Sequence, residues 1–134
     1  MGIWGCHMSS FDQLPTEVQA ALAADMTIDI TTIGRRSGEP RRIEIWFLNV
    51  DGLIYITGTP GPRDWFANLA AHSSLIFHLK ESVVADLPAT ATIVDQRDER
   101  ARVFHAPSAA WYLNQGDSLD SLLAHAPMVR LAFD

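Results

Sequence analysis

The dipeptide Asp51-Gly52 constrains the fold most strongly, because it joins two runs that have the composition of β-strands. Residues 41–50 are rich in Ile, Trp and Phe, and residues 53–57 resume a similar apolar pattern after the dipeptide. Asp-Gly between two such runs is typical of a tight hairpin, which places the strands side by side and antiparallel. The sequence therefore predicts an antiparallel sheet.

Apolar residues that recur at period two predict further strands, and stripes at helical spacing predict helices. The expected strands are 28–33, 41–50, 53–57, 74–80, 83–94 and 129–133. The expected helices are 15–24, 63–72 and 95–105, with one or two short helices in 108–124. About six strands with two to four helices outside them indicate a small, mainly antiparallel β-barrel of the α+β class. Trp46, Phe47 and Phe77 lie on strands and are expected in the core.

Composition limits the classes of function. With 134 residues, 48% hydrophobic and 19% charged, the chain has the size of one domain with one core. Its net charge of −6 argues against nucleic-acid binding, which needs a basic face. No apolar run approaches the ~20 residues of a membrane span, so no membrane anchor is expected.

Residues 8–134 are expected to form this single domain, after an artificial or misassigned leader at residues 1–7. The leader holds the only cysteine, Cys6, and His7, so neither is assigned any chemistry. One cysteine excludes an internal disulfide and a cysteine zinc cluster. The other histidines are scattered, so no metal site is expected, and the lack of a secretory signal favours the cytoplasm.

Residues 34–42, Gly-Arg-Arg-Ser-Gly-Glu-Pro-Arg-Arg, hold four of the ten basic residues of this acidic chain between two expected strands. Arginine forks match phosphate or carboxylate oxygens, and backbone N–H groups in such a turn can form an anion nest. The hypothesis is an anion-binding loop for a phosphorylated ligand, and the alternative is a solvated basic turn. The candidate residues are Arg35, Arg36, Ser37, Gly38 and Arg41.

A second loop, residues 58–62, also follows a strand and leads into a helix. Gly58 allows close approach of a ligand, and Arg63 stands where the positive end of the helix dipole favours anions. Trp65 either packs on a ligand ring or fills the core. Farther along, Trp111 and Tyr112 either cap a pocket or pack on the barrel.

Several of these residues occur in an order that resembles the deazaflavin-dependent nitroreductase family. The segments are Thr31-Thr-Ile-Gly-Arg-Arg-Ser-Gly-Glu-Pro-Arg41, Ile45-Trp-Phe47, Val50-Asp-Gly52, and Gly58 to Leu69 with its Trp-Phe-Ala-Asn-Leu ending. The resemblance covers residues 26–80 well and the C-terminal half weakly. Arg36 stands where the family usually has Lys, and the loop after Gly58 is shorter and lacks the lysine of many members.

The resemblance implies a split β-barrel related to FMN-binding oxidoreductases. In such a protein Arg35, Arg36, Ser37, Gly38 and Arg41 would hold the phosphate and acidic tail of the deazaflavin coenzyme F-420. Thr57, Gly58 and Thr59 would line the ring or the phosphate, and Arg63 and Trp65 would close that side. Trp111 and Tyr112 are the candidates for the substrate side, and no catalytic residue is assigned.

The function implied is hydride transfer from reduced F-420 to an electron-poor small molecule, such as a quinone, a nitroaromatic compound or an activated alkene, with FMN as the alternative cofactor. A second hypothesis is a non-catalytic carrier of a flavin, haem or lipid-like ligand on the same barrel. A third is a structural domain that has lost the cofactor. Split barrels of this kind often pair, which makes a homodimer one expected arrangement.

Overall fold

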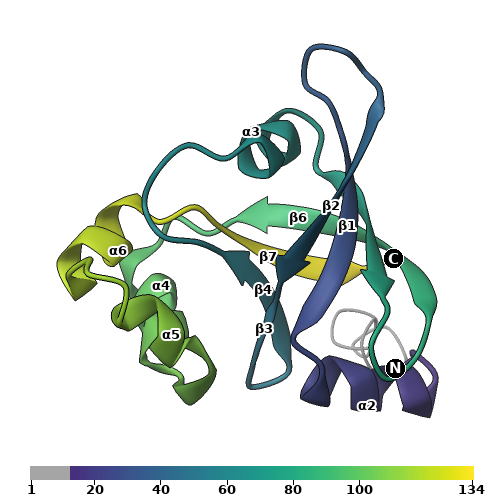
Figure 1. Cartoon of the computed structure of the whole chain (residues 1–134), viewed down its shortest axis with the longest axis horizontal. Coiled ribbons are helices and arrows are strands. Elements are labelled where there is room, and N and C mark those ends of the chain that lie inside the picture. The colour runs from purple at the N-terminus through teal and green to yellow at the C-terminus, as the bar shows by residue number, and fades with distance from the viewer. Residues whose placement is uncertain (1–12) are drawn as a thin grey trace, which may run out of the picture.

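The computed structural model describes residues 13–134, which form five α-helices and seven β-strands (Figure 1). The helices are α2 (Thr16–Ala24), α3 (Asp64–Ala71), α4 (Arg97–His105), α5 (Ala110–Leu113) and α6 (Leu119–His125), with a 3-10 turn at Pro107–Ala109. The strands are β1 (Thr27–Ile33), β2 (Pro40–Trp46), β3 (Leu48–Val50), β4 (Leu53–Thr57), β5 (Ser74–Leu79), β6 (Ala85–Ile93) and β7 (Met128–Phe133). The expected leader and the first residues of the domain lie outside the described residues.

The seven strands form one sheet in the order β2-β1-β5-β6-β7-β4-β3, and every neighbouring pair is antiparallel. β2 and β3 are the two edges of this sheet, yet only Phe47 separates them in the chain. The sheet must therefore curl until its edges meet, which makes it a split barrel. The expected α+β, mainly antiparallel split barrel is confirmed, with six strands if β2 and β3 count as one bent strand.

The prediction of one continuous strand over 41–50 is wrong, because the chain bends at Phe47. The Phe47 N–H still donates to the Met26 carbonyl (3.0 Å), which extends the pairing with β1, whereas Leu48 pairs with Tyr55 of β4. The Phe47 side chain is 3% exposed, as expected of a core residue. Trp46 is 37% exposed, so its predicted place in the core is wrong. Its partner in the β1 ladder is Thr27, on the outer side of the barrel.

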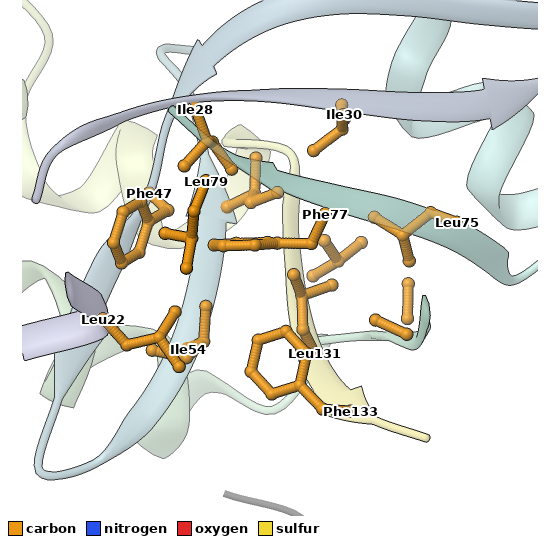
Figure 2. Packing of buried hydrophobic residues seen from close by; sticks show 14 of the residues in the cluster. Leu22, Ile28, Ile30, Phe47, Ile54, Leu75, Phe77, Leu79, Leu131 and Phe133 are labelled. Carbon is orange, nitrogen blue, oxygen red and sulfur yellow. The ribbon is translucent and has the colours of Figure 1, made fainter. Parts of the chain in front are cut away.

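Phe77 lies at the centre of the barrel interior, surrounded by aliphatic side chains (Figure 2). It is fully buried, as predicted, and meets the rings of Phe47 and Phe133 edge to face at 5.2 and 5.3 Å. Ile28 and Ile30 reach the same core because alternate residues of β1 face inward. Burial of one such side chain stabilises the fold by about 1.5–3 kcal/mol, so the inner faces of the strands hold the barrel together.

The helices take different positions around this barrel (Figure 1). α4, α5 and α6 gather beside β3 and β4 and cover a second apolar cluster that includes Tyr55 and Phe104. α3 lies near the end of the barrel from which the β1–β2 loop projects. That end is therefore where the two loops singled out in the sequence come together.

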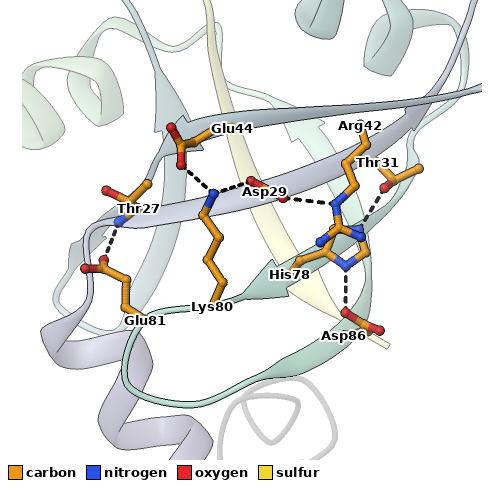
Figure 3. A network of polar contacts seen from close by, with 9 residues as sticks. All are labelled: Thr27, Asp29, Thr31, Arg42, Glu44, His78, Lys80, Glu81 and Asp86. Atoms are coloured by element: carbon orange, nitrogen blue, oxygen red, sulfur yellow. Dashed lines mark hydrogen bonds and ion pairs between the residues drawn. The ribbon is translucent and has the colours of Figure 1, made fainter.

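The outer face of β1, β2 and β5 carries polar side chains that pair with one another (Figure 3). Asp29 accepts hydrogen bonds from Lys80 Nζ (2.6 Å) and Arg42 Nε (3.0 Å), and Lys80 also pairs with Glu44. His78 lies between the hydroxyl of Thr31 and the carboxylate of Asp86, at 2.7 Å from each. Arg42 is thus engaged on this face, away from the residues that the inner side of β2 presents.

A second polar cluster, between β4, β7 and α4, is partly buried. Arg130 Nη1 donates to both carboxylate oxygens of Glu99 (2.8 and 2.6 Å), and the Tyr55 hydroxyl donates to Glu99 Oε2 (2.7 Å). Burial by itself raises the pKa of Glu99, but the hydrogen bonds from Arg130 and Tyr55 outweigh it and hold that pKa below its ordinary value. The ionised form of Glu99 is therefore the one that stabilises the fold.

The contribution of Glu99 to stability is present above its ordinary pKa and is lost as the pH falls through the lower folded-state pKa. We expect Glu99→Gln to reduce the free energy of unfolding at neutral pH by about 1–3 kcal/mol, because a charge-assisted contact is lost. The dependence of stability on acid pH should also become weaker. Urea denaturation at a series of pH values measures both effects, with the exposed neighbour Asp98→Asn as the control. An equal pH dependence in the wild type and Glu99→Gln would contradict the assignment.

Candidate functional site

The loop between β1 and β2 is closed by its own hydrogen bonds. The Gly34 N–H donates to the Glu39 carbonyl and the Gly38 N–H donates to the Gly34 carbonyl, both at 2.9 Å. Gly38 has φ +71°, a conformation that suits glycine. Ser37 Oγ accepts from the Glu39 N–H (3.1 Å), and its own O–H has no acceptor among residues 13–134. The loop thus holds a fixed shape and keeps one hydroxyl donor available for a ligand.

The arginines of this loop have different roles. Arg35 is anchored, because its main-chain N–H and its Nη1 both donate to Asn68 Oδ1 at 3.0 Å, and its Nη2 lies 3.4 Å from Asp64 Oδ1. The side chains of Arg36 and Arg41 make no hydrogen bond or ion pair with any other residue from 13 to 134. Two exposed guanidinium groups therefore retain all their donors for a ligand.

These residues surround a cavity of about 540 Å³, which we call the arginine cavity. Three arginines face it against one carboxylate, that of Asp64, so it favours anions. Its volume is within the range of small-molecule sites. The residues that line it are Thr32, Gly34, Arg35, Arg36, Ser37, Arg41, Ile43, Asp64, Trp65 and Asn68.

The second loop folds around the guanidinium of Arg63. Arg63 Nη2 donates to the carbonyl and hydroxyl of Thr59 (3.0 and 3.2 Å), and Nη1 donates to the Pro62 carbonyl (3.2 Å). A Cβ atom at Gly61, where φ is +135°, would lie only 3.1 Å from Nη1. All three acceptors are neutral, so the loop keeps a positive charge beside Gly58 that no carboxylate in residues 13–134 neutralises.

A second cavity, of about 420 Å³, lies between this loop, β2 and α5, and we call it the aromatic cavity. Trp111 packs edge to face on Trp46 (5.2 Å) and on Tyr112 (5.1 Å). It is lined by Glu44, Ile45, Trp46, Gly58, Thr59, Arg63, Trp111 and Tyr112. Trp46, Trp111 and Tyr112 also line a smaller cavity of about 210 Å³, so this aromatic group has open space on two sides.

Tyr112 combines a buried ring with an unpartnered hydroxyl. The residue is 5% exposed, and burial raises the pKa of its phenol, which keeps it protonated at neutral pH. The hydroxyl makes no hydrogen bond within residues 13–134. Every fully buried polar side-chain atom in residues 13–134 has a hydrogen-bond partner. The unpartnered Tyr112 oxygen is therefore not fully buried and is open to solvent. A buried tyrosine normally satisfies its hydroxyl, so this donor is available to a ligand.

The two cavities follow one another along β2 and the start of α3. Arg41 and Ile43 line the arginine cavity, Ile45 and Trp46 line the aromatic cavity, and Arg63 directly precedes α3. Five steps along a strand span about 16 Å. The arrangement suits one extended ligand that is anionic at one end and has an apolar or aromatic part at the other.

The structure brings most of the predicted residues to these cavities. Arg35, Arg36, Ser37, Arg41 and Trp65 line the arginine cavity, and Gly58, Thr59, Arg63, Trp111 and Tyr112 line the aromatic one. Gly38 and Thr57 line neither, and the Thr57 hydroxyl donates to the Pro127 carbonyl instead (2.6 Å). Trp65 is both a core residue and part of the cavity wall.

Sequence reasoning missed Asn68, which was noted only as part of the Trp-Phe-Ala-Asn-Leu segment. It is buried, contacts the basic loop and lines the arginine cavity. The signal was a lone amide on the buried side of an apolar helix, between Trp65 and Leu69.

Within residues 13–134, no helix has the length and apolar character that a membrane span requires. That part of the chain also contains no group of three or more His, Cys, Asp or Glu side chains that could hold a metal ion.

The chain is similar to several known proteins. The family model described as F420H2-dependent quinone reductase matches residues 8–118; F420H2 is reduced F-420. No curated protein sequence matches significantly. Three solved structures share the fold at low identity. An FAD-binding protein from Mesorhizobium loti is 12% identical over 90% of this chain and 91% of its own (TM-score 0.65). A protein described as an F420 reductase is 12% identical over 90% and 96% (TM-score 0.64), and one described as a domain-swapped dimer is 18% identical over 80% of each chain (TM-score 0.54).

A side chain at Gly34 would displace the Ser37 hydroxyl, which would have to give up its hydrogen bond from the Glu39 N–H. A Cβ atom at this position would lie 2.5 Å from Ser37 Oγ, far inside van der Waals contact. We expect Gly34→Ala to lower the free energy of unfolding by about 1–3 kcal/mol, as overpacking does. The double variant Gly34→Ala/Ser37→Ala removes the colliding oxygen and should recover part of this loss. Thermal denaturation of the variants measures it; a double variant no more stable than Gly34→Ala would contradict the collision.

Proposed function

Because the chain belongs to the F420H2-dependent quinone reductase family, we propose that this F-420-dependent reductase acts on a quinone or another electron-poor small molecule. The coenzyme would lie along β2, with its phosphate and acidic tail in the arginine cavity and its ring in the aromatic cavity. The electron acceptor would bind against Trp111 and Tyr112.

The unpartnered guanidinium groups of Arg36 and Arg41 carry this proposal. In a chain with a net charge of −6, two free cations on the wall of one cavity favour an anionic ligand over an internal carboxylate. Each can bind a phosphate or carboxylate through two parallel N–H donors. The Ser37 hydroxyl adds a neutral donor between them in sequence. The residues present therefore fit the tail of F-420.

The aromatic cavity fits the ring of the coenzyme. Gly58 carries no side chain, and Arg63 places a positive charge beside it. When bound, reduced F-420 supplies the hydride. The chain contributes orientation of the ring, aromatic walls that exclude water, and a hydrogen-bond donor.

Tyr112 is the residue that we assign to the acceptor. Addition of a hydride to a quinone leaves negative charge on its oxygen, and that oxygen takes up a proton to complete the hydroquinone. The protonated Tyr112 hydroxyl can donate a hydrogen bond to this oxygen where the charge develops. The same interaction would serve the oxygen of a nitro group, so nitroaromatic compounds are included in the proposal.

Titration calorimetry with oxidised F-420 and, in parallel, FMN tests the proposal. Binding of F-420 with weak or absent binding of FMN is the expected result. Preference for FMN would keep the fold but change the redox chemistry to that of a true flavin. Binding of F-420 without turnover of any quinone or nitroaromatic compound would favour a carrier, and binding of neither cofactor would favour a structural domain.

Two expectations from the sequence remain predictions. A homodimer agrees with a structural neighbour described as a domain-swapped dimer, and gel filtration with light scattering would measure it. Location in the cytoplasm rests on the sequence alone.

Arg41 and Arg42 provide a matched pair, because these consecutive residues of β2 face opposite sides of the sheet. Arg41 lines the arginine cavity, whereas Arg42 pairs with Asp29 on the outer face (Figure 3). We expect Arg41→Ala and Arg36→Ala each to weaken F-420 binding by about 1.5–3 kcal/mol, as charge-assisted hydrogen bonds are lost. Arg42→Ala should leave it unchanged. Equal effects of Arg41→Ala and Arg42→Ala in calorimetry would reject the assignment.

The role of Tyr112 predicts a separation between binding and turnover. Tyr112→Phe keeps the ring that packs on Phe104 and Trp111 and removes only the hydroxyl. We expect the affinity for F-420 to stay constant and kcat for quinone reduction to fall about tenfold to a hundredfold, because a donor to the developing oxyanion is lost. Steady-state kinetics measure this change, and an unaltered kcat would remove Tyr112 from the reaction.

A further inference from the structure

We propose that Asn68 is a positioning residue, which fixes the basic loop for the phosphate-bearing tail and so makes the protein prefer the whole coenzyme over its tail-less deazaflavin ring. This inference rests on the proposed function, since it concerns how the same site recognises F-420. It assigns to Asn68 a role beyond packing, although the residue lies on the buried side of α3.

The Asn68 side chain joins three elements. Its Oδ1 accepts from the main-chain N–H of Arg35 and from Arg35 Nη1, both at 3.0 Å. Its Nδ2 donates to the hydroxyl of Thr32 at the end of β1 (3.2 Å). Asn68 and Thr32 are only 4% and 2% exposed, so neither can exchange these partners for water without local opening. One amide therefore connects α3 to the end of β1 and to the start of the basic loop.

The chemistry of these contacts requires an amide. One end must accept two N–H groups and the other must donate to a hydroxyl. Leucine has the same branched shape and number of side-chain heavy atoms, although it is larger, and it supplies neither function. Aspartate would keep the acceptor for Arg35 but add a negative charge to the wall of the arginine cavity, which opposes an anionic ligand. Leucine therefore tests the Arg35 contact without a change of charge.

Asn68 acts through Arg35 and not on the ligand directly. The residue is only 4% exposed, its amide oxygen already accepts two hydrogen bonds, and one of its two amide N–H groups donates to buried Thr32. Fixing the Arg35 main chain sets the direction of the next two residues, Arg36 and Ser37, which have the free donors. A loop held in this way loses little conformational entropy when an anion binds, and this preorganisation increases affinity.

The effect of Asn68 should be confined to binding of the phosphate-bearing tail of the coenzyme. None of the Asn68 hydrogen bonds reaches residues 57–63 or the residues that line the aromatic cavity. Binding of the ring is thus independent of Asn68, whereas binding of the phosphate depends on it. The ratio of the affinities for the whole coenzyme and for a deazaflavin riboside without phosphate reports this role specifically.

The experiment compares Thr32→Val with Thr32→Val/Asn68→Leu. Asn68→Leu alone would leave the buried Thr32 hydroxyl without a partner, so the valine background keeps the site apolar on both sides and protects folding. Calorimetric titrations with oxidised F-420 and with the phosphate-free riboside give the two affinities, and circular dichroism checks the fold.

We expect Thr32→Val to keep a preference for the whole coenzyme, because the Asn68 oxygen still accepts from Arg35 in this variant. Thr32→Val/Asn68→Leu should lose about tenfold to a hundredfold of that preference, with its riboside affinity unchanged. An unchanged preference in the double variant, or an equal loss for both ligands, would overturn the role of Asn68 and leave the proposed function intact. If the wild type itself shows no preference for the phosphate-bearing coenzyme, the proposed function fails together with this inference.

Discussion

The bend at Phe47 is the constraint on which the rest of the structure depends. One residue connects the two edges of the sheet, so the sheet must close on itself, and the buried Phe47 ring fixes the seam against Phe77. β2 consequently pairs only with β1, and its other side is not covered by a further strand. The arginine cavity and the aromatic cavity both lie along this uncovered strand. The bend that closes the barrel therefore also leaves room for the site.

The alternation of side chains along β2 then divides the charges of the basic segment. Arg41 lines the arginine cavity, while Arg42 faces the outer side, where Asp29 neutralises it. Neighbouring arginines in the sequence are therefore separated in space, one satisfied within the protein and one available for a ligand. An acidic protein can in this way present a local basic cavity without a large cluster of unpaired charge.

Much of this could be read from the sequence. Asp51-Gly52 and the period-two runs predicted the hairpins and nearly all the strands, and the glycines and arginines of the two loops predicted where the cavities lie. The break at Phe47 could not be predicted, because residues 41–50 have continuous strand character and only tertiary closure decides where they bend. Trp46 was misplaced for a different reason: neighbouring residues of a strand face opposite sides, so Trp46 faces outward, against Trp111, while Phe47 fills the core. The role of Asn68 depends on contacts more than thirty residues away in the chain, which no local pattern records.

The central claim is that one extended anionic coenzyme lies along β2 between the two loops. The crystal structure of the protein with oxidised F-420 tests it most directly. The account predicts phosphate and carboxylate oxygens within hydrogen-bond distance of Arg36 and Arg41, and the deazaflavin ring beside Gly58 and Thr59. A coenzyme bound with its phosphate on the outer face at Arg42 and Lys80, or with its ring in the arginine cavity, would contradict it.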